Sequence, residues 1–475
     1  MRMSIKHLFV ISLILVSFTT YGQKNRKEFE PKTETAEIEI KIKGGSAGIT
    51  KLGSCYGNQR VLKDSAIADS TGKVVFKSSL PYPPGLYFVV YSNNVNVTFL
   101  LDKNQKFFLY ADKDDFANTM KTNSAENLLY YNNFKYETGL TKRIDSLNNK
   151  IAAAKDGSKE YLKLKDAHKK LIQEKRDTVN GYVKKYPGSF FAAFKYMGQN
   201  PILQEPKKPN GELDSALQLQ LYRNQFWDNY DFNDERMVRT PVFYNKLNTY
   251  LTNLFPQRVD SIMKGVRFIM EKVDKGDTLL FNFTLNYLAL FYKESTVMGG
   301  EKIFCYVVDN YLTLKKAYWA DSVTIVRIRA QSDLRRPSLL GEIGQDLNCK
   351  NEKGEYVSLY SIKKPIRIVY LYNPDCEHCI KETPDLMKLY AEWKSKGLEI
   401  YAVDVEREYD KWHDFIKKFH LDCINIIDPD RESHFDLKYY IENTPGLYVL
   451  DSNNKIVAKR LLPDQLPIIF EMMLK

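Results

Sequence analysis

The sequence predicts a multidomain protein with an N-terminal antiparallel β-sandwich, a central all-α region and a C-terminal α/β domain. The 475 residues are enough for about three domains of about 150 residues each. Short alternating segments separated by turn residues fill residues 36–120, and helical spacing of apolar residues dominates residues 125–335. Residues 338–475 alternate apolar strands with amphipathic helices, the pattern of an α/β domain.

The net charge separates the last of these regions from the other two. The whole sequence carries +11, but 19 Lys and Arg against 24 Asp and Glu from Ser338 onward give this region −5 and leave +16 for the rest. A basic region suggests a nucleic-acid partner. The sequence has no nucleic-acid-binding motif and no zinc-ligand spacing, so we expect neither a nucleic-acid partner nor a metal.

Residues 1–22 have the three-part pattern of a secretory signal peptide. Arg2 and Lys6 precede an apolar run over residues 8–16, and Gly22 marks the expected cleavage position. The alternative is an N-terminal membrane anchor, but the run is too short to span a bilayer comfortably. We therefore expect an exported protein of the periplasm or cell envelope, a setting in which disulfide chemistry is available.

Residues 36–120 are predicted to form a small β domain. The segment from Ala36 to Ile42 alternates apolar and polar residues with a period of two, which is typical of a half-buried strand. Turns containing glycine or proline separate it from further apolar segments at residues 74–76, 86–91 and 95–101. Short strands at this spacing favour an antiparallel sandwich.

Residues 125–335 are predicted to form a helical domain in which no catalytic constellation is visible. Apolar periodicity indicates helices at residues 213–228, 242–254, 258–273, 279–296 and 301–318, in addition to a lysine-rich helical stretch before them. The lysines between residues 155 and 175 fit either a solvated helix face or a basic helix for an acidic partner. Residues 329–336 are expected to be a linker ending at Pro337.

A Cys-x-x-Cys pair, Cys376 and Cys379, follows the apolar segment Ile366–Tyr372 and precedes a helical pattern. The pair therefore lies at the junction of a buried strand and a helix N-terminus. Unpaired backbone N–H groups and the helix dipole favour an anion there, so the reactive thiolate of Cys376 is stabilised. Cys379 lies one turn further along the helix, where it can close a disulfide with Cys376 and release a bound partner.

The two residues between the cysteines are expected to act on the thiolate in opposite senses. His378 can donate a hydrogen bond to it or act as a cation, which favours the reduced form and gives the pair oxidising power. Glu377 disfavours the thiolate. A half zinc site is one alternative, but no second ligand pair has suitable spacing, and a permanently closed disulfide is the other.

Residues 338–475 resemble the TlpA/ResA-like thiol–disulfide oxidoreductases, a family with the thioredoxin fold. The resemblance rests on Gly341–Leu347, Asn351–Leu359, Cys376-Glu377-His378-Cys379, Glu382-Thr383-Pro384 and Thr444-Pro445. It implies that Pro445 is the cis-proline opposite the active site and that the backbone of Thr444 pairs with the substrate. The preceding regions are similar to a small β domain and a helical region of unassigned role that precede such domains.

The sequence departs from the thioredoxin pattern at two positions. Asp375 stands where thioredoxins carry tryptophan, and Tyr370 stands where their buried acid falls. We expect the fold to tolerate both changes, whereas the reduction potential and the proton route are left open. Supporting roles near the pair are expected for Glu377, Glu382, Tyr372 and Pro374.

These features predict an exported enzyme, a thiol–disulfide oxidoreductase that reduces or oxidises disulfides of envelope proteins through a mixed disulfide. Cys376 attacks, Cys379 resolves, and no cofactor beyond the Cys376–Cys379 pair is expected. The expected partners are exported proteins with disulfides or thiols and an upstream membrane redox partner, and a peripheral membrane contact stays open. The alternatives are an envelope binding or scaffold protein with an inert thioredoxin-like domain, and a dedicated isomerase.

Overall fold

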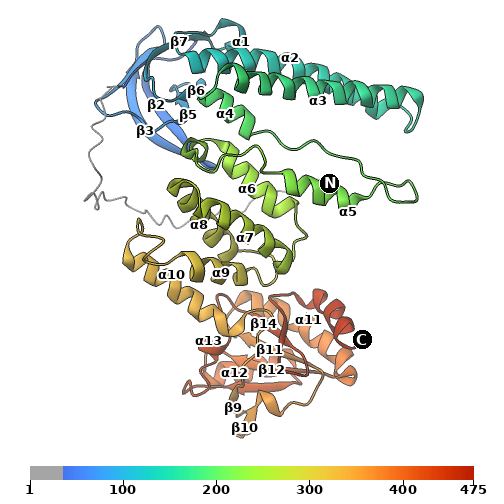
Figure 1. Ribbon diagram of the computed structural model, residues 1–475. Coiled ribbons are helices and arrows are strands. Elements are labelled where there is room, and N and C mark those ends of the chain that lie inside the picture. Colours follow the sequence, from blue (N-terminus) through green and yellow to red (C-terminus); the bar gives the residue numbers. More distant parts are fainter. Residues whose placement is uncertain (1–35) are drawn as a thin grey trace.

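A computed structural model describes residues 36–475 of the chain (Figure 1). The expected signal peptide over residues 1–22 lies outside the described residues. From the N-terminal to the C-terminal side, Figure 1 shows β sheets, a helical region and an α/β domain. The predicted fold class is therefore confirmed.

The first region is a sandwich of two four-stranded sheets, with strand orders β4-β1-β7-β8 and β3-β2-β5-β6. The strands are β1 (Ala36–Lys43), β2 (Gly48–Tyr56), β3 (Gln59–Ala68), β4 (Lys73–Ser78), β5 (Gly85–Val90), β6 (Asn96–Leu101), β7 (Lys106–Asp112) and β8 (Lys121–Thr122), with the short helix α1 (Phe116–Thr119) after β7. Apolar side chains from both sheets, such as Ile38, Leu109, Val89 and Phe99, meet in one core. Residues such as Glu37 and Lys41 alternate with the buried ones and lie outside it, as the period of two requires.

One pairing in this sandwich is not antiparallel. β1 pairs with β7 in parallel, in a register that matches Glu37 to Lys106 and Lys43 to Asp112, while β1 pairs with β4 antiparallel. Alternation along a strand fixes which face is buried but says nothing about the direction of the neighbouring strand. The first sheet is therefore mixed, whereas the second is antiparallel throughout.

The helical region begins with a long antiparallel hairpin of α2 (Ala125–Ala153) and α3 (Lys159–Lys185), which projects from the rest of the molecule (Figure 1). The helices that follow are α4 (Phe190–Met197), α5 (Ser215–Gln225), α6 (Pro241–Asn253), α7 (Val259–Asp274), α8 (Thr278–Lys293), α9 (Glu301–Tyr311) and α10 (Ser322–Arg335). The linker expected at residues 329–336 is wrong, because α10 continues to Arg335 and only the 3-10 turn Arg336–Ser338 follows. A core of large aromatic and aliphatic residues fills this region.

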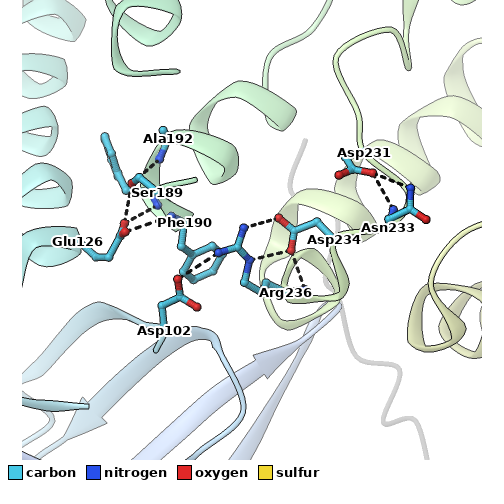
Figure 2. Close-up of polar contacts among 10 residues, drawn as sticks. Asp102, Glu126, Ser189, Phe190, Ala192, Asp231, Asn233, Asp234 and Arg236 are labelled. Atoms are coloured by element: carbon cyan, nitrogen blue, oxygen red, sulfur yellow. Dashed lines mark hydrogen bonds and ion pairs between the residues drawn. The ribbon is translucent and has the colours of Figure 1, made fainter. Parts of the chain in front are cut away.

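An ion pair between Arg236 and Asp102, which Figure 2 shows in close-up, joins the helical region to the β-sandwich. Arg236 donates to Asp234 at 2.6 Å and to Asp102, just after β6, at 3.1 Å.

Within the helical region, the Glu126 carboxylate on α2 accepts hydrogen bonds from the Ser189 hydroxyl at 2.8 Å and from the backbone N–H of Phe190 at 3.2 Å. A carboxylate at these positions caps the N-terminus of α4 and interacts favourably with its dipole.

The C-terminal domain is built on a seven-stranded mixed sheet with the order β10-β9-β13-β12-β11-β14-β15. Its elements are β9 (Asn348–Asn351), β10 (Tyr356–Ser358), β11 (Ile366–Tyr372), α11 (Glu377–Trp393), β12 (Leu398–Asp404), α12 (Tyr409–Phe419), β13 (Ile424–Ile427), α13 (Phe435–Lys438), β14 (Gly446–Leu450), β15 (Ile456–Lys459) and α14 (Leu466–Met473). Helices α11, α12 and α14 pack on one face of the sheet, and α13 packs on the other. Every residue of β11 is buried, including Arg367, which explains why its sequence is mostly apolar and lacks a polar alternation.

Candidate functional site

The cysteine pair lies where β11 ends and α11 begins. The backbone N–H of Cys376 donates to the Asn373 carbonyl at 3.1 Å, and the N–H of Asp375 donates to the Asn373 side chain at 2.8 Å, so the intervening residues form a tight turn. Pro374 is buried within this turn. Cys376 is the N-cap of α11, and its carbonyl accepts the N–H of Ile380 at 3.0 Å. The predicted junction of strand and helix is thus present.

Cys376 faces the loop that carries Thr444 and Pro445, 68 residues further along the chain. Its thiol donates to the Thr444 carbonyl, with a sulfur–oxygen distance of 3.3 Å. The peptide bond between Thr444 and Pro445 is cis, as the family resemblance implied. The structure therefore brings together the expected nucleophile and the expected substrate-binding loop.

The two cysteines of the pair differ in exposure and in acidity, and both thiols are free. Burial raises the pKa of the Cys376 thiol, but hydrogen bonds from the Thr444 side chain and from the N–H groups of Cys379 and His378 outweigh it and leave the pKa below its ordinary value. Cys379 is fully buried, and this burial raises its pKa to about 12. Because the thiolate is the reactive form, Cys376 can attack an incoming disulfide and Cys379 can act only after it.

The polar side chains next to the cysteine pair differ in how far they are exposed to solvent. Glu377 and His378 are exposed on the first turn of α11, and Glu382 is half-buried one turn later. In the part of the chain that the structure describes, no hydrogen bond joins the His378 imidazole to Cys376. His378 and Glu382 instead line a hollow of about 240 Å³ with Thr444, Pro445 and Arg460, which we call the active-site cavity.

A stack of tyrosines lies behind the pair, at the place where the sequence lacks the buried acid of thioredoxin. The Tyr370 hydroxyl is 2.8 Å from the Thr383 hydroxyl, which donates to the Cys379 carbonyl at 2.7 Å. The Tyr370 ring stacks on Tyr372, and Tyr372 stacks on Phe415. Burial raises the pKa of Tyr370 far above its ordinary value, so this position supplies a neutral hydroxyl rather than a carboxylate.

The sequence analysis missed a buried acid, Asp404, on the strand next to the active-site turn. Asp404 pairs in register with Tyr372 and accepts the N–H groups of Glu406 and Arg407, each at 3.0 Å. The side chain of Asn373 in turn donates to Glu406 at 2.8 Å. Burial raises the pKa of Asp404 to about 6. Its signal in the sequence is an acid that follows the apolar run of residues 400–403 at the end of the strand Leu398–Asp404.

We predict that Asp404→Asn is more favourable for the stability of the fold at pH 8 than at pH 4. The unfolded chain ionises Asp404 near its ordinary pKa of 3.8 and the folded chain only near 6, so ionisation opposes folding as the pH rises through this window. The amide has no charge to bury, although its NH2 replaces one accepting oxygen at both pH values, so we expect the change in the free energy of unfolding to be about 1–3 kcal/mol more favourable at pH 8 than at pH 4. Urea unfolding at pH 4 and at pH 8 measures this change in the free energy of unfolding. The exposed Asp414→Asn serves as the control, and an equal change at both pH values would contradict the assignment.

Alkylation is predicted to distinguish the two thiols. At pH 7 iodoacetamide should modify Cys376 in the folded protein faster than an unstructured cysteine, since its thiolate fraction rises more than its nucleophilicity falls. The rate should reach half of its maximum at a lower pH than it does for an unstructured cysteine, because the pKa of Cys376 lies below its ordinary value. Cys379 should react only after unfolding. Peptide mass mapping at several pH values checks this, and equal labelling of both thiols would refute it.

The described residues 36–475 contain no group of three or more His, Cys, Asp or Glu side chains placed to hold a metal ion. Among the helices described for these residues, none combines the length and the apolar character needed to cross a bilayer.

Three protein families match successive parts of the chain. Residues 340–459 match the AhpC/TSA family, residues 165–337 match a domain of unknown function (DUF5106), and residues 36–130 match another domain of unknown function (DUF4369). These matches cover the α/β domain, most of the helical region and the β-sandwich.

Relatives of known name are similar to parts of the chain. The thiol-disulfide oxidoreductase ResA of Bacillus subtilis is 27% identical over 108 residues, which are 23% of this chain and 59% of ResA. The chain thus spans less than two thirds of the curated relatives it matches. Among solved structures, the thioredoxin domain of a thiol-disulfide oxidoreductase from Bacteroides vulgatus is 29% identical, with 29% of this chain and 98% of that chain covered and a TM-score of 0.27. A thioredoxin-like protein from Bacteroides caccae is 18% identical and covers 58% of this chain and 99% of its own, with a TM-score of 0.45.

Proposed function

Since the chain carries a C-terminal AhpC/TSA domain with a thioredoxin fold, related to ResA-like thiol–disulfide oxidoreductases, we propose that it is an exported enzyme that exchanges disulfides with envelope proteins. The observation that carries the proposal is the inequality of the two thiols: Cys376 is accessible and acidified, while Cys379 is buried with a pKa of about 12. A permanently closed disulfide would not require one thiol to be accessible and acidified and the other to be buried. The exported location rests on the expected signal peptide of residues 1–22.

The proposed reduction proceeds in two exchanges. The Cys376 thiolate attacks one sulfur of the partner disulfide, the partner's S–S bond breaks, and its other sulfur leaves as a thiolate that takes up a proton. Cys379 then loses its proton and attacks the Cys376 sulfur, which releases the second partner thiol and forms the Cys376–Cys379 disulfide. Two electrons pass to the partner, and a membrane redox partner with a dithiol returns them. The same steps in reverse oxidise a partner.

The loop opposite the pair is proposed to hold the polypeptide during the first exchange. The Thr444 carbonyl already contacts the Cys376 sulfur at 3.3 Å, so a strand paired with the Thr444 backbone would lie against the nucleophile. The active-site cavity beside this loop offers both charged and apolar lining for partner side chains. We assign no electron-transfer role to the β-sandwich.

Partner capture with Cys379→Ser tests the proposal. This variant retains the nucleophile but lacks the resolving thiol, so it should accumulate mixed disulfides at Cys376 with reducible envelope proteins. The wild type should reduce insulin disulfides in the presence of a dithiol. A pair that no dithiol opens, with no insulin reduction and no captured partner, would favour the scaffold alternative and refute the proposal.

A further inference from the structure

The helical region meets the C-terminal domain directly beside the substrate-binding loop. The last residue of α10, Arg335, and the turn after it lie against the segment between α13 and β14, residues 439–445. This segment contains Thr444 and Pro445 at its end. A contact that holds this segment also fixes the distance between Thr444 and Cys376.

Arg335 is fully buried, and its guanidinium reaches across this boundary. It lies over the Tyr440 ring at 4.1 Å and donates through Nη2 to the Glu442 carboxylate at 3.4 Å. Its Nη1 donates to the Gln331 carbonyl at 3.0 Å, one turn back on α10. A planar guanidinium suits such a site because it can stack on a ring and donate in its plane at the same time.

Glu442 connects Arg335 to the active-site cavity. Its second carboxylate oxygen lies 3.6 Å from Arg460, which lines the cavity with Thr444 and Pro445. Glu442 is thus held between one arginine of the helical region and one of the cavity wall. It stands two residues before Thr444, so a displacement of Glu442 is passed to Thr444 through two peptide units.

Ser338 provides a second attachment for the same segment. Its hydroxyl accepts the backbone N–H of Tyr440 at 3.1 Å, and its carbonyl accepts the Lys459 ammonium at 2.7 Å. Lys459 forms a buried ion pair with Glu301 at the start of α9. The segment is therefore fixed from the helical side at Tyr440 and at Glu442.

We infer that Arg335 is a positioning residue for the substrate-binding loop and that the helical region thereby takes part in recognising polypeptide disulfides. The inference rests on the proposed function. Loop position matters for a polypeptide because its strand must pair with the Thr444 backbone, and a displaced loop binds that strand more weakly. A small disulfide needs only the Cys376 thiolate and does not depend on the loop.

The test compares Arg335→Met, Glu442→Gln and the double variant with wild type. For insulin reduction we expect KM to rise about five- to tenfold with kcat retained, the effect of losing one charge-assisted hydrogen bond. Exchange with glutathione disulfide and the alkylation rate of Cys376 should stay unchanged. The effects of the two substitutions on KM should not be additive in the double variant, because both substitutions remove the contact between Arg335 and Glu442. Arg335→Lys keeps a charge over Tyr440 and should restore part of the KM.

The neighbouring Arg336 provides the matched control. It pairs with Asp309 and Asp333, both in the helical region, so Arg336→Met should leave the KM unchanged. Glu442→Gln alters a partly exposed side chain and therefore tests the inference even if Arg335→Met fails to fold. An active wild type whose KM is unaffected by Glu442→Gln would overturn the inference and leave the proposed function standing. A wild type that reduces no disulfide would instead overturn the proposed function.

Discussion

Replacing Cys376 by serine is expected to lower the rate of disulfide reduction at pH 7 by at least about 10³-fold, to the level of uncatalysed exchange. A serine hydroxyl does not ionise at this pH and forms no mixed disulfide. Cys379 cannot take over, because with a pKa of about 12 only about 10⁻⁵ of it is thiolate at pH 7. Burial also keeps its sulfur from an incoming disulfide.

Insulin reduction followed by turbidity, or by titration of released thiols, measures this loss. Cys423→Ala in the same domain is the matched control, since Cys423 is a cysteine with a pKa that burial raises and with no contact to the pair, and it should retain the wild-type rate. Retention of activity in Cys376→Ser, with loss in Cys379→Ser, would reverse the assigned roles of the two thiols.

Replacing Glu301 by glutamine is expected to weaken the docking of the C-terminal domain on the helical region by about 3–5 kcal/mol. Glu301 is 3% exposed and Lys459 is 1% exposed, so the variant leaves the Lys459 ammonium buried with the Ser338 carbonyl and the Tyr448 ring. The lysine limits the cost by releasing its proton. At pH 7 this release costs about 4–5 kcal/mol for an ordinary pKa of about 10.4.

Tryptic cleavage between Arg335 and Arg336 measures the docking, because Arg335 is fully buried in the intact interface. When opening is fast relative to cleavage, the rate follows the population of the open form, so we expect cleavage to accelerate about 10²–10⁴-fold. The double variant Glu301→Leu with Lys459→Met removes both charges and should recover most of the loss. Glu271→Gln, in an exposed pair with Lys275, is the control. Unchanged cleavage in Glu301→Gln would show that the ion pair does not hold the domains together.

The cysteine pair and its location could be predicted from the sequence, because a strand, a Cys-x-x-Cys and a helix are adjacent in the chain. Thr444 was reached only through the family resemblance, since nothing local marks a residue that folding brings to Cys376 from 68 positions away. Asp404 was missed because an acid at the end of a strand usually faces solvent. Here the loop over Glu406 and Arg407 covers it.

The packing between the last two domains could not be predicted, because the residues that form the contact have the local sequence pattern of an exposed linker. Arg335 and its neighbours suggested an exposed linker, since a cluster of arginines before a proline is rarely buried. Its partners Tyr440 and Glu442 lie in another domain, and the same holds for Glu301 and Lys459. Long-range pairing of charged side chains leaves no periodic signal in a single sequence.

The parallel pairing of β1 with β7 also determines the order in which the first domain can fold. β1 lies between β4 and β7, and its Lys43 matches Asp112, 69 positions later. The first sheet cannot form fully until β7 has been synthesised, because β7 pairs with β1. This pairing closes a long loop, and closing a long loop slows folding. A nascent chain that ends before residue 106 therefore holds β1 with one edge unpaired, a state open to pairing with other chains.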